Sequence, residues 1–326
     1  MNIMKTYKTR SFWINKKNKG VIESGQVSTL GDNEIVIRTK YSGISFGTEK
    51  LVFTGKVPKS QRNLMRCPHQ EGNFGEKLKY GYINVGKVID GCSDLINKNV
   101  FSFFPHQDVF KIHRENIIII PDDIPLTRSL LLPNLETAIN AVWDTIPSIG
   151  DKIIVVGAGV VGLLTAYLLN KIPGTEVVVV DKDKKRKKIV SSLGLNYLDK
   201  IPKNFEPNFI FECTGNHNVL NQLKQHIAYE TTICILSWYG NEISKISLGE
   251  EFFSKRAKII ISQVSRISPN RSKYSMVDRR RIALNILQDN ILDNLIEKNQ
   301  VKFEDLEKFF IKEKNSNNLL CKVVKY

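Results

Sequence analysis

A glycine-rich stretch between two valine-rich runs constrains this sequence more than any other feature. Residues 152–162 read Lys-Ile-Ile-Val-Val-Gly-Ala-Gly-Val-Val-Gly, and an apolar segment of helical character follows at 163–169. A second valine-rich run, 177–180, leads directly into Asp181. This order predicts a strand, a G-x-G-x-x-G turn, a helix and a second strand. That combination is the βαβ unit that binds dinucleotides.

Each residue of the predicted turn has a physical role. Gly157 permits a tight turn, and Gly159 leaves the backbone open to a pyrophosphate. Gly162 lets the helix pack close to the strand. The N–H groups at the start of the helix, at Val160 and Val161, attract the phosphates.

The residues after the second strand bear on the choice between NAD and NADP. The Asp181 carboxylate can accept hydrogen bonds from the adenosine ribose and repels a 2′-phosphate. Lys182 and Arg186 favour the phosphate, but the attraction of mobile, solvated cations is screened within about 8–10 Å. We therefore expect NAD, with NADP as the weaker ligand.

The remaining sequence predicts an α/β protein. Up to about residue 123, Gly and Pro separate short strand-like runs at 34–39, 81–90, 100–104 and 117–120. Strand-like runs then alternate with helical ones, at 153–156, 176–180, 209–212, 232–236 and 257–261. Such alternation is typical of a doubly wound parallel sheet. Two helices, 278–288 and 303–312, and a closing strand, 319–324, complete the chain.

Composition limits the partners and the location. The chain has 326 residues and a net charge of +15, so a nucleic-acid partner has to be considered. The densest basic cluster, 182–188, is interrupted by Asp183 and contains no aromatic residues for base stacking, so we do not expect one. No secretory signal and no apolar run long enough for a membrane span are seen, and the five cysteines form no C-x-x-C pair. We expect a cytoplasmic protein.

Several motifs in this order resemble the medium-chain dehydrogenase/reductase superfamily. They are the glycine turn and the stretches Ser42-Gly-Ile-Ser-Phe-Gly-Thr-Glu49, Gly81-Tyr-Ile-Asn-Val-Gly86 and Glu212-Cys-Thr-Gly215. The resemblance implies a GroES-like β-rich catalytic domain at 1–125, a Rossmann domain at 126–265 and a segment, 266–326, that returns to the first domain. It also implies that a homodimer can form. The stretches that begin at Ser42 and at Gly81 look like those of a zinc-free branch that includes bacteriochlorophyllide-type dehydrogenases.

The sequence departs from the zinc-binding members of that superfamily at every ligand position. Ser45 or Phe46 stands where those members have a cysteine, and Tyr82 replaces a histidine. Their third ligand falls near Pro133, and the four cysteines of a structural zinc loop are missing. A zinc site needs three or four N, S or O ligands, so we expect neither a catalytic nor a structural zinc.

Four residues are candidates for proton transfer. By resemblance, Thr48 relays the substrate proton, and Glu49 orients its loop. A Tyr82 phenol with a lowered pKa would serve as an acid or base, and His106 is a candidate general acid or base because histidine as a residue type suits that role. The alternatives are a turn-capping threonine, a half-buried strand tyrosine and a histidine with structural partners only. Resemblance places Ser45, Phe46 and Phe104 at the substrate pocket.

The cofactor side has a second set of candidates. Thr137 matches a nicotinamide contact by resemblance. The others follow strands of the predicted parallel sheet, whose carboxyl ends bind ligands. They are Thr214, Gly215, Ser237, Trp238 and Gln263.

These features favour a zinc-independent oxidoreductase that transfers hydride between NAD(H) and a polar or bulky small-molecule alcohol or ketone. Two alternatives stay open: an NADPH-dependent quinone or enone reductase, and a non-catalytic NAD-binding redox sensor. The substrate and the direction of reaction are not given by the sequence.

Overall fold

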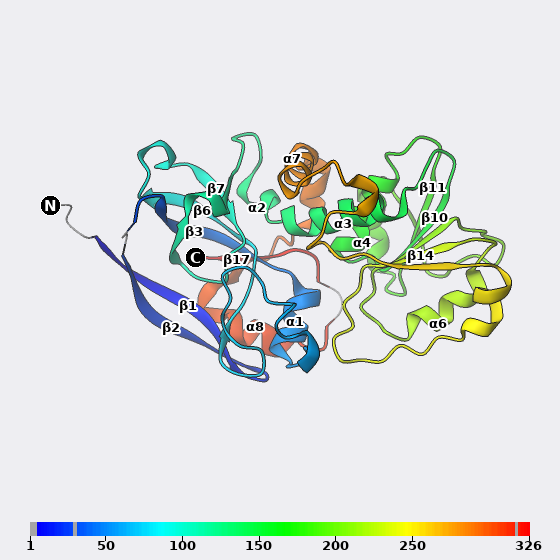
Figure 1. Ribbon diagram of the computed structural model, residues 1–326, viewed down its shortest axis with the longest axis horizontal. Coiled ribbons are helices and arrows are strands. Elements are labelled where there is room, and N and C mark those ends of the chain that lie inside the picture. The colour runs from blue at the N-terminus through cyan, green and yellow to red at the C-terminus, as the bar shows by residue number, and fades with distance from the viewer. Residues whose placement is uncertain (1–4, 29–30, 317–318) are drawn as a thin grey trace. The chain divides into compact units, whose positions relative to one another are not determined.

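The computed structural model describes residues 5–28, 31–316 and 319–326 and divides into two compact units (Figure 1). Unit 1 combines Met1–Leu131 with Ile296–Tyr326, and unit 2 is Leu132–Leu295. The return to the first unit therefore begins at 296, later than the expected 266. The reason is that α7 (Met276–Ile286) packs on α3 (Leu132–Thr145) inside unit 2.

Unit 1 contains two mainly antiparallel sheets. The smaller has the order β2-β1-β5-β4 and is built on a long hairpin. Its strands are β1 (Thr6–Lys16), β2 (Lys19–Ser28), β4 (Glu71–Gly72) and β5 (Leu78–Lys79). The sequence analysis did not predict this hairpin, because Lys, Arg, Thr and Ser occupy so much of it that the apolar alternation is masked.

The larger sheet of unit 1 has the order β16-β17-β3-β6-β7-β9, with β8 also paired to β3. Its strands are β3 (Glu34–Ile44), β6 (Asn84–Asp90), β7 (Asn99–Ser102), β8 (Val109–His113), β9 (Ile117–Ile119), β16 (Val301–Lys302) and β17 (Lys322–Lys325). The antiparallel register of β17 on β3 joins the two ends of the sequence, with Val324 opposite Ser42. Apolar side chains from β3, β6, β7 and β8 form a buried cluster with Leu95 and Phe104.

Three helices complete unit 1: α1 (Phe46–Phe53), α2 (Leu126–Ser129) and α8 (Leu306–Glu313). The ring of Phe310 stacks on Phe53 at 5.0 Å and on Phe12 at 5.9 Å between ring centroids. These aromatic contacts tie α8 to α1 and β1, so the late segment is part of the core of unit 1.

Unit 2 has a six-stranded parallel sheet with the order β12-β11-β10-β13-β14-β15. The strands are β10 (Lys152–Val156), β11 (Glu176–Val180), β12 (Asn196–Leu198), β13 (Phe209–Glu212), β14 (Thr232–Ile235) and β15 (Lys258–Ile261). The helices between them are α4 (Val160–Leu169), α5 (Arg186–Ser192) and α6 (Val219–Leu223). The expected α/β class, with a β-rich domain and a doubly wound parallel sheet, is confirmed.

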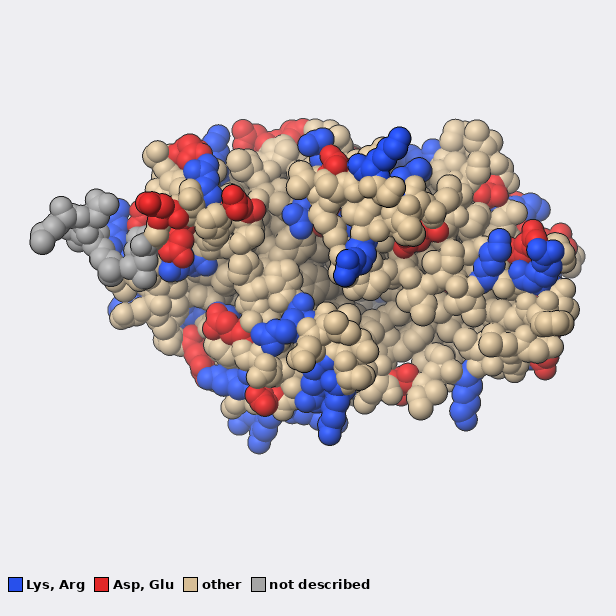
Figure 2. Space-filling model, in the orientation of Figure 1, with Lys and Arg blue, Asp and Glu red and all other residues tan. Residues whose placement is uncertain are grey.

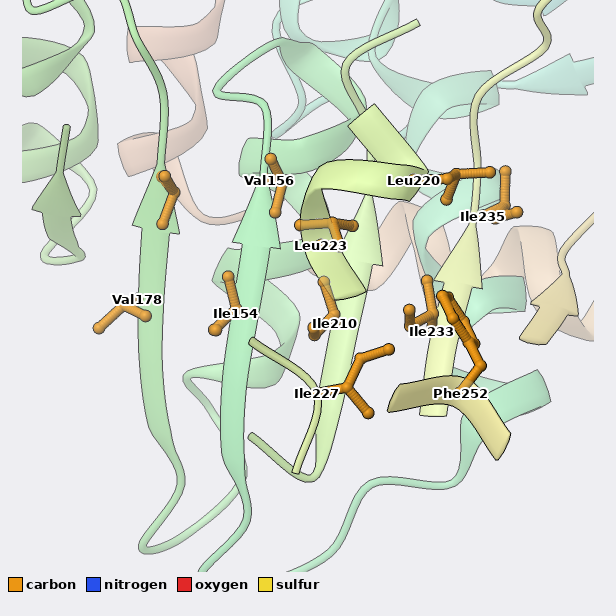
Figure 3. Close-up of a cluster of buried hydrophobic side chains, with 11 residues drawn as sticks. Ile154, Val156, Val178, Ile210, Leu220, Leu223, Ile227, Ile233, Ile235 and Phe252 are labelled. Carbon is orange, nitrogen blue, oxygen red and sulfur yellow. The ribbon is translucent and has the colours of Figure 1, made fainter. Parts of the chain in front are cut away.

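One face of this sheet carries the apolar cluster of Figure 3. Ile154 and Val156 of β10 and Ile233 and Ile235 of β14 point into it, because side chains alternate between the two faces of a strand. Leu220 of α6 packs over them. Helix α4 contacts β10 and β11 and contributes nothing to this cluster, so it covers the opposite face.

On one face of the molecule, the basic side chains are distributed rather than gathered. On the face in Figure 2, Lys and Arg stand in small groups with Asp and Glu among them. Among the described residues, no helix combines the length and apolar character needed to cross a bilayer.

Candidate active site

The glycine turn of unit 2 has the close contacts that its sequence predicts. Gly157 follows β10 with φ +102°, a conformation that favours glycine, and Gly159 precedes α4. A Cβ atom on Gly162 would lie 1.9 Å from the carbonyl oxygen of Gly157, so only glycine lets α4 approach the turn. A Cβ on Gly159 would meet nothing within 4 Å. The space beside Gly159 is therefore open to a ligand.

The start of α4 offers backbone donors to that space. Gly159 is the N-cap residue and has no side chain to accept a hydrogen bond from the first helical turn. Val160 and Val161 occupy the first two helical positions, and both are partly exposed. A helix N-terminus of this kind binds phosphate through its N–H groups and its dipole.

Asp181 is fixed beside the turn. Its Oδ2 accepts a hydrogen bond of 2.8 Å from the N–H of Ala158, and its Oδ1 accepts one of 2.9 Å from the N–H of Asp183. Lys182 is exposed, whereas the Arg186 side chain is buried at the start of α5. The carboxylate is thus held rigidly beside the glycine turn.

A buried carboxylate organises the loops after β13 and β14. Glu212 is fully buried, and its two oxygens accept hydrogen bonds from the Thr214 N–H at 2.7 Å and the Tyr239 hydroxyl at 2.6 Å. Burial, with the Glu212 charge, raises the pKa of Tyr239 and keeps the phenol protonated. The Ser237 hydroxyl oxygen accepts from the Gly215 N–H at 2.8 Å. Glu212 belongs to the Glu212-Cys-Thr-Gly215 motif, but its sequence context did not predict this role.

The other predicted cofactor residues of unit 2 are held by local bonds. The Thr137 hydroxyl donates to the carbonyl of Pro133 at 3.0 Å within α3. Gln263 follows β15, is exposed, and its side-chain oxygen accepts from the Ser265 N–H at 2.6 Å. Trp238 is partly exposed after β14.

His106 lies in the loop between β7 and β8 of unit 1, and its side chain is buried. Its Nε2 is 2.8 Å from Glu49 Oε2, and its Nδ1 is 2.7 Å from the Ser42 hydroxyl. Gly81, with φ +125°, allows this close packing, because a Cβ there would lie 3.0 Å from the His106 ring. The imidazole is therefore bonded at both nitrogens rather than open to solvent.

The hydrogen bonds extend beyond the histidine on both sides. Glu49 Oε1 accepts a hydrogen bond of 2.8 Å from the Ser45 N–H, which closes the first turn of α1. On the other side, the Ser42 hydroxyl is 3.0 Å from the hydroxyl of Tyr326. Neither Ser42 nor Tyr326 was a predicted site residue.

Tyr82 is partly exposed and contacts the other end of this network. Its phenol hydrogen-bonds the side chains of Ser45 and Thr48. Burial raises the pKa of Tyr82 to about 12, more than the two hydroxyl groups lower it. The expectation of a lowered pKa is thus wrong, because desolvation disfavours the phenolate.

The two aromatic residues expected at the substrate pocket are largely buried. The Phe104 ring stacks on Phe110 at 3.8 Å, and the exposed His69 stacks on its other side at 5.2 Å. Phe46 makes an edge contact with Phe309 at 6.2 Å. Both rings therefore belong to the packing of unit 1.

The residues at the zinc-ligand positions do not fit a zinc ion. Pro133 offers no side-chain ligand, and Ile83, the residue after Tyr82, is an apolar side chain buried against Gly43. The Tyr82 phenol has a pKa of about 12, so it is protonated at neutral pH and is not a phenolate ligand. Nowhere in the described parts of the chain do three or more His, Cys, Asp and Glu side chains gather as a metal site.

Comparison with known proteins gives the fold a context. The sequence-family profile described as "Glucose dehydrogenase C-terminus" matches residues 135–318, more than half of the chain. D-guloside 3-dehydrogenase of Escherichia coli K12 is 22% identical over 280 residues, which cover 77% of this chain and 79% of that protein.

Solved structures of dehydrogenases superpose on nearly the whole chain. L-idonate 5-dehydrogenase of E. coli K-12 has a TM-score of 0.79 at 14% identity and covers 99% of both chains. An E. coli CFT073 alcohol dehydrogenase in complex with NADH has a TM-score of 0.75 at 14% identity and covers 98% of this chain and 99% of its own. At such identities the likeness establishes the fold alone.

Proposed function

Because this chain belongs to the medium-chain dehydrogenase/reductase superfamily, in the family with the glucose dehydrogenase C-terminus, we propose that it is a zinc-independent dehydrogenase that uses NAD. It is an NAD(P)-dependent, alcohol dehydrogenase-like oxidoreductase, and the proposal concerns its metal, its preferred cofactor and its substrate. The substrate that we propose is a polyhydroxylated alcohol or the corresponding ketone.

The observation that carries the choice of cofactor is the glycine turn with its fixed carboxylate. The open space at Gly159 would accommodate the pyrophosphate against the start of α4. Asp181, held by the Ala158 N–H, would accept hydrogen bonds from the ribose and repel a 2′-phosphate. Thr214, Gly215 and the other loop residues after the sheet would hold the nicotinamide end.

Bound NAD supplies the hydride chemistry, so the protein's own groups have to orient the substrate and handle a proton. Tyr82 keeps its proton at neutral pH and can donate a hydrogen bond to a substrate oxygen. Ser45 and Thr48 hold the phenol in place. Glu49 and His106 form the buried inner part of the site: Glu49 accepts a hydrogen bond from the Ser45 N–H, and His106 is bonded to Glu49.

Zinc independence rests on the chemistry of the residues at the family's ligand positions. Without a metal, the carbonyl has to be polarised by hydrogen bonds, and the hydroxyl groups of Thr48 and Tyr82 are the available donors. The metal content of the purified protein tests this proposal. One tightly bound zinc per chain would contradict it.

The substrate class is suggested by the relatives. The names of two of them, D-guloside 3-dehydrogenase and L-idonate 5-dehydrogenase, describe dehydrogenases of sugar derivatives. The hydroxyl-rich face formed by Ser45, Thr48 and Tyr82 suits a substrate with several hydroxyl groups. We expect NAD reduction with members of a panel of sorbitol, L-idonate and alkyl hexosides. A panel with no turnover, despite tight NADH binding, would instead favour the redox sensor.

Calorimetry tests the cofactor. NADH should bind at least about tenfold more tightly than NADPH, which corresponds to about 1.4 kcal/mol. Equal affinity or a preference for NADPH would favour the quinone or enone reductase.

We also propose a homodimer and a cytoplasmic location. Strand β15 forms one edge of the parallel sheet, with Ile261 74% exposed, and an apolar edge of this kind pairs readily with a second copy. All five cysteines are free thiols, in keeping with a reducing compartment. Sedimentation of the wild-type protein and Ile261→Lys tests the dimer: the variant should sediment as a monomer.

A further inference from the structure

Two titratable side chains of the site in unit 1, Glu49 and His106, are enclosed by protein and have no direct contact with water. Glu49 is 2% exposed and His106 is 1% exposed. If this pair takes up or releases a proton during each turnover, that proton needs a route to solvent. The route has to follow groups that can both donate and accept hydrogen bonds.

Hydrogen bonds from His106 lead to one such route. The Ser42 hydroxyl lies 2.7 Å from His106 Nδ1 and 3.0 Å from the Tyr326 hydroxyl. Tyr326 is partly exposed, and its ring stacks on Phe303 at 4.6 Å between centroids. The charges of Arg10 and Asp108, which pair at 2.9 Å, act on its phenol.

We propose that Ser42 and Tyr326 form a proton relay that connects the buried Glu49–His106 pair with solvent. The inference rests on the proposed oxidoreductase function for its role in turnover. Ser42 and Tyr326 are positioning residues in this scheme, because they act through His106 and do not touch the reacting atoms.

When Glu49 is ionised, all hydrogen bonds of the network can be donated in one direction, from Tyr326 toward Glu49. Tyr326 then donates to Ser42, Ser42 donates to Nδ1 of a neutral His106, and Nε2–H donates to the Glu49 carboxylate. This tautomer follows from the pattern of partners. Ser42 and His106 each have one donor and one acceptor in use in this line, so the line can transfer a proton without either of them being left unpaired.

The transfer balances in protons and charge. A hydronium ion in the solvent gives a proton to the Tyr326 oxygen and becomes water, and the phenolic proton passes to Ser42. The Ser42 proton passes to Nδ1, and the Nε2 proton passes to Glu49. Glu49 becomes a neutral carboxylic acid, and each intermediate group has lost one proton and gained one. Reduction of a ketone would draw on this proton, and oxidation of an alcohol would return one by the reverse steps.

A structural role for the same contacts predicts a different outcome. Ser42 and Tyr326 also join β17 to β3, and loss of a bond there would loosen the packing around His106. Loosening accelerates exchange of buried protons with water. Loss of a relay slows it, because the direct route is broken. The sign of the change in exchange rate therefore distinguishes the two roles.

The experiment measures exchange of the His106 Nε2 proton with water by NMR on the full-length protein without ligands. Tyr326→Phe keeps the ring that stacks on Phe303 and removes only the hydroxyl, and Ser42→Ala breaks the line at a second point. Tyr7→Phe is the matched control, since it removes a phenolic hydrogen bond of 2.8 Å to Asp90 in the same unit.

We expect exchange at least about tenfold slower in Tyr326→Phe and Ser42→Ala, and unchanged exchange in Tyr7→Phe. Equal or faster exchange in Tyr326→Phe would overturn the relay. This result does not depend on any substrate, so it stands even if the proposed function is wrong.

Turnover provides the second measurement, with sorbitol and NAD as the probe. Tyr326→Phe should lower kcat about tenfold at an unchanged KM for sorbitol, and added imidazole should restore part of the loss. An unchanged kcat would remove the relay from catalysis. If the wild-type protein does not oxidise sorbitol, the substrate proposal fails, and the exchange measurement alone decides the relay.

Discussion

The glycine turn of unit 2 and the histidine network of unit 1 are built in opposite ways. At the turn, the absence of side chains is decisive. Gly162 allows contact between the helix and the turn, and Gly159 leaves space for a ligand. In the network, side chains meet in the interior and satisfy one another, with His106 bonded at both nitrogens. Added atoms should therefore damage the first region, and removed atoms should damage the second.

This contrast also separates binding from proton handling. The turn offers backbone groups that bind any pyrophosphate of suitable shape. The network contains side chains that can gain or lose a proton, and its proposed role in turnover depends on that exchange. A variant in the turn should change affinity for the cofactor, whereas a variant in the network should change turnover at unchanged cofactor affinity.

Gly162→Val should have the largest effect. Its Cβ would lie 1.9 Å from the carbonyl of Gly157, so α4 has to move away from the turn. We expect NADH binding to be lost and the free energy of unfolding to fall by more than about 3 kcal/mol. Calorimetry and urea unfolding measure the two effects.

Gly159→Ala is the matched control for that variant. A Cβ at this position meets no protein atom within 4 Å, so stability should be unchanged. Affinity for NADH should still fall, by about tenfold or more, because the methyl group occupies the pyrophosphate space. Unchanged affinity would show that the cofactor binds elsewhere.

Arg279→Met tests whether a second buried polar network, the one around Arg279 in unit 2, takes part in cofactor binding. Arg279 pairs with Glu136 at 3.2 Å and with Asn140 at 2.8 Å, and it ties α7 to α3. Removing it leaves a buried carboxylate without this partner, so unfolding should become easier by about 3–5 kcal/mol. Calorimetry below the unfolding transition should give unchanged NADH affinity. A large loss of affinity would make this network part of the cofactor site.

His106→Ala should lower turnover about 10²-fold while NADH affinity stays constant. The loss reflects the missing proton carrier between Ser42 and Glu49. His69→Asn is a suitable control, because His69 is exposed and has φ +57°, which asparagine tolerates. Steady-state kinetics of sorbitol oxidation compare the two. Similar losses in both variants would remove His106 from the mechanism.

Asp181→Asn should have a smaller effect that is confined to the choice of cofactor. Loss of the negative charge removes the repulsion of a 2′-phosphate, so the preference for NADH over NADPH should fall by about tenfold. Titration of both cofactors into wild-type and variant protein measures the ratio. An unchanged ratio would show that another residue selects the cofactor.

Tyr82 affects stability only at alkaline pH, within a defined pH window. Its pKa of about 12 in the folded protein exceeds the value of about 10 for a free phenol. The folded state therefore favours the protonated phenol, and the resulting stability is lost as pH rises from about 10 to 12. Tyr82→Phe should weaken this decline in urea unfolding series. A decline identical to that of the wild type would show that Tyr82 is solvated like a free phenol.

The two regions also differed in how far the sequence could predict them. The glycine turn lies within a few residues of sequence, so its spacing predicted the strand, the turn and the helix that the structure contains. The network joins positions far apart: 64 residues separate Ser42 from His106, and 284 separate Ser42 from Tyr326. The pairing of β17 with β3 brings Tyr326 to Ser42, and local sequence patterns do not specify that register.

The errors have similar physical origins. The pKa of Tyr82 depends on burial, which is a property of the fold and not of the residue type. Glu212 has its role because it is enclosed together with Tyr239, 27 residues later in the chain. The hairpin of β1 and β2 was missed because its polar side chains hide the period of a strand.

The division of the chain has a consequence for biosynthesis. Unit 2 is one continuous segment, Leu132–Leu295, whereas unit 1 needs both Met1–Leu131 and Ile296–Tyr326. As the ribosome extends the polypeptide, the nucleotide-binding half can finish folding before β17 has been translated. The first 131 residues have to wait, with residues 41–44 of β3 lacking their β17 partner, until the final strand emerges. The newborn protein should thus capture its coenzyme before it can turn over a substrate.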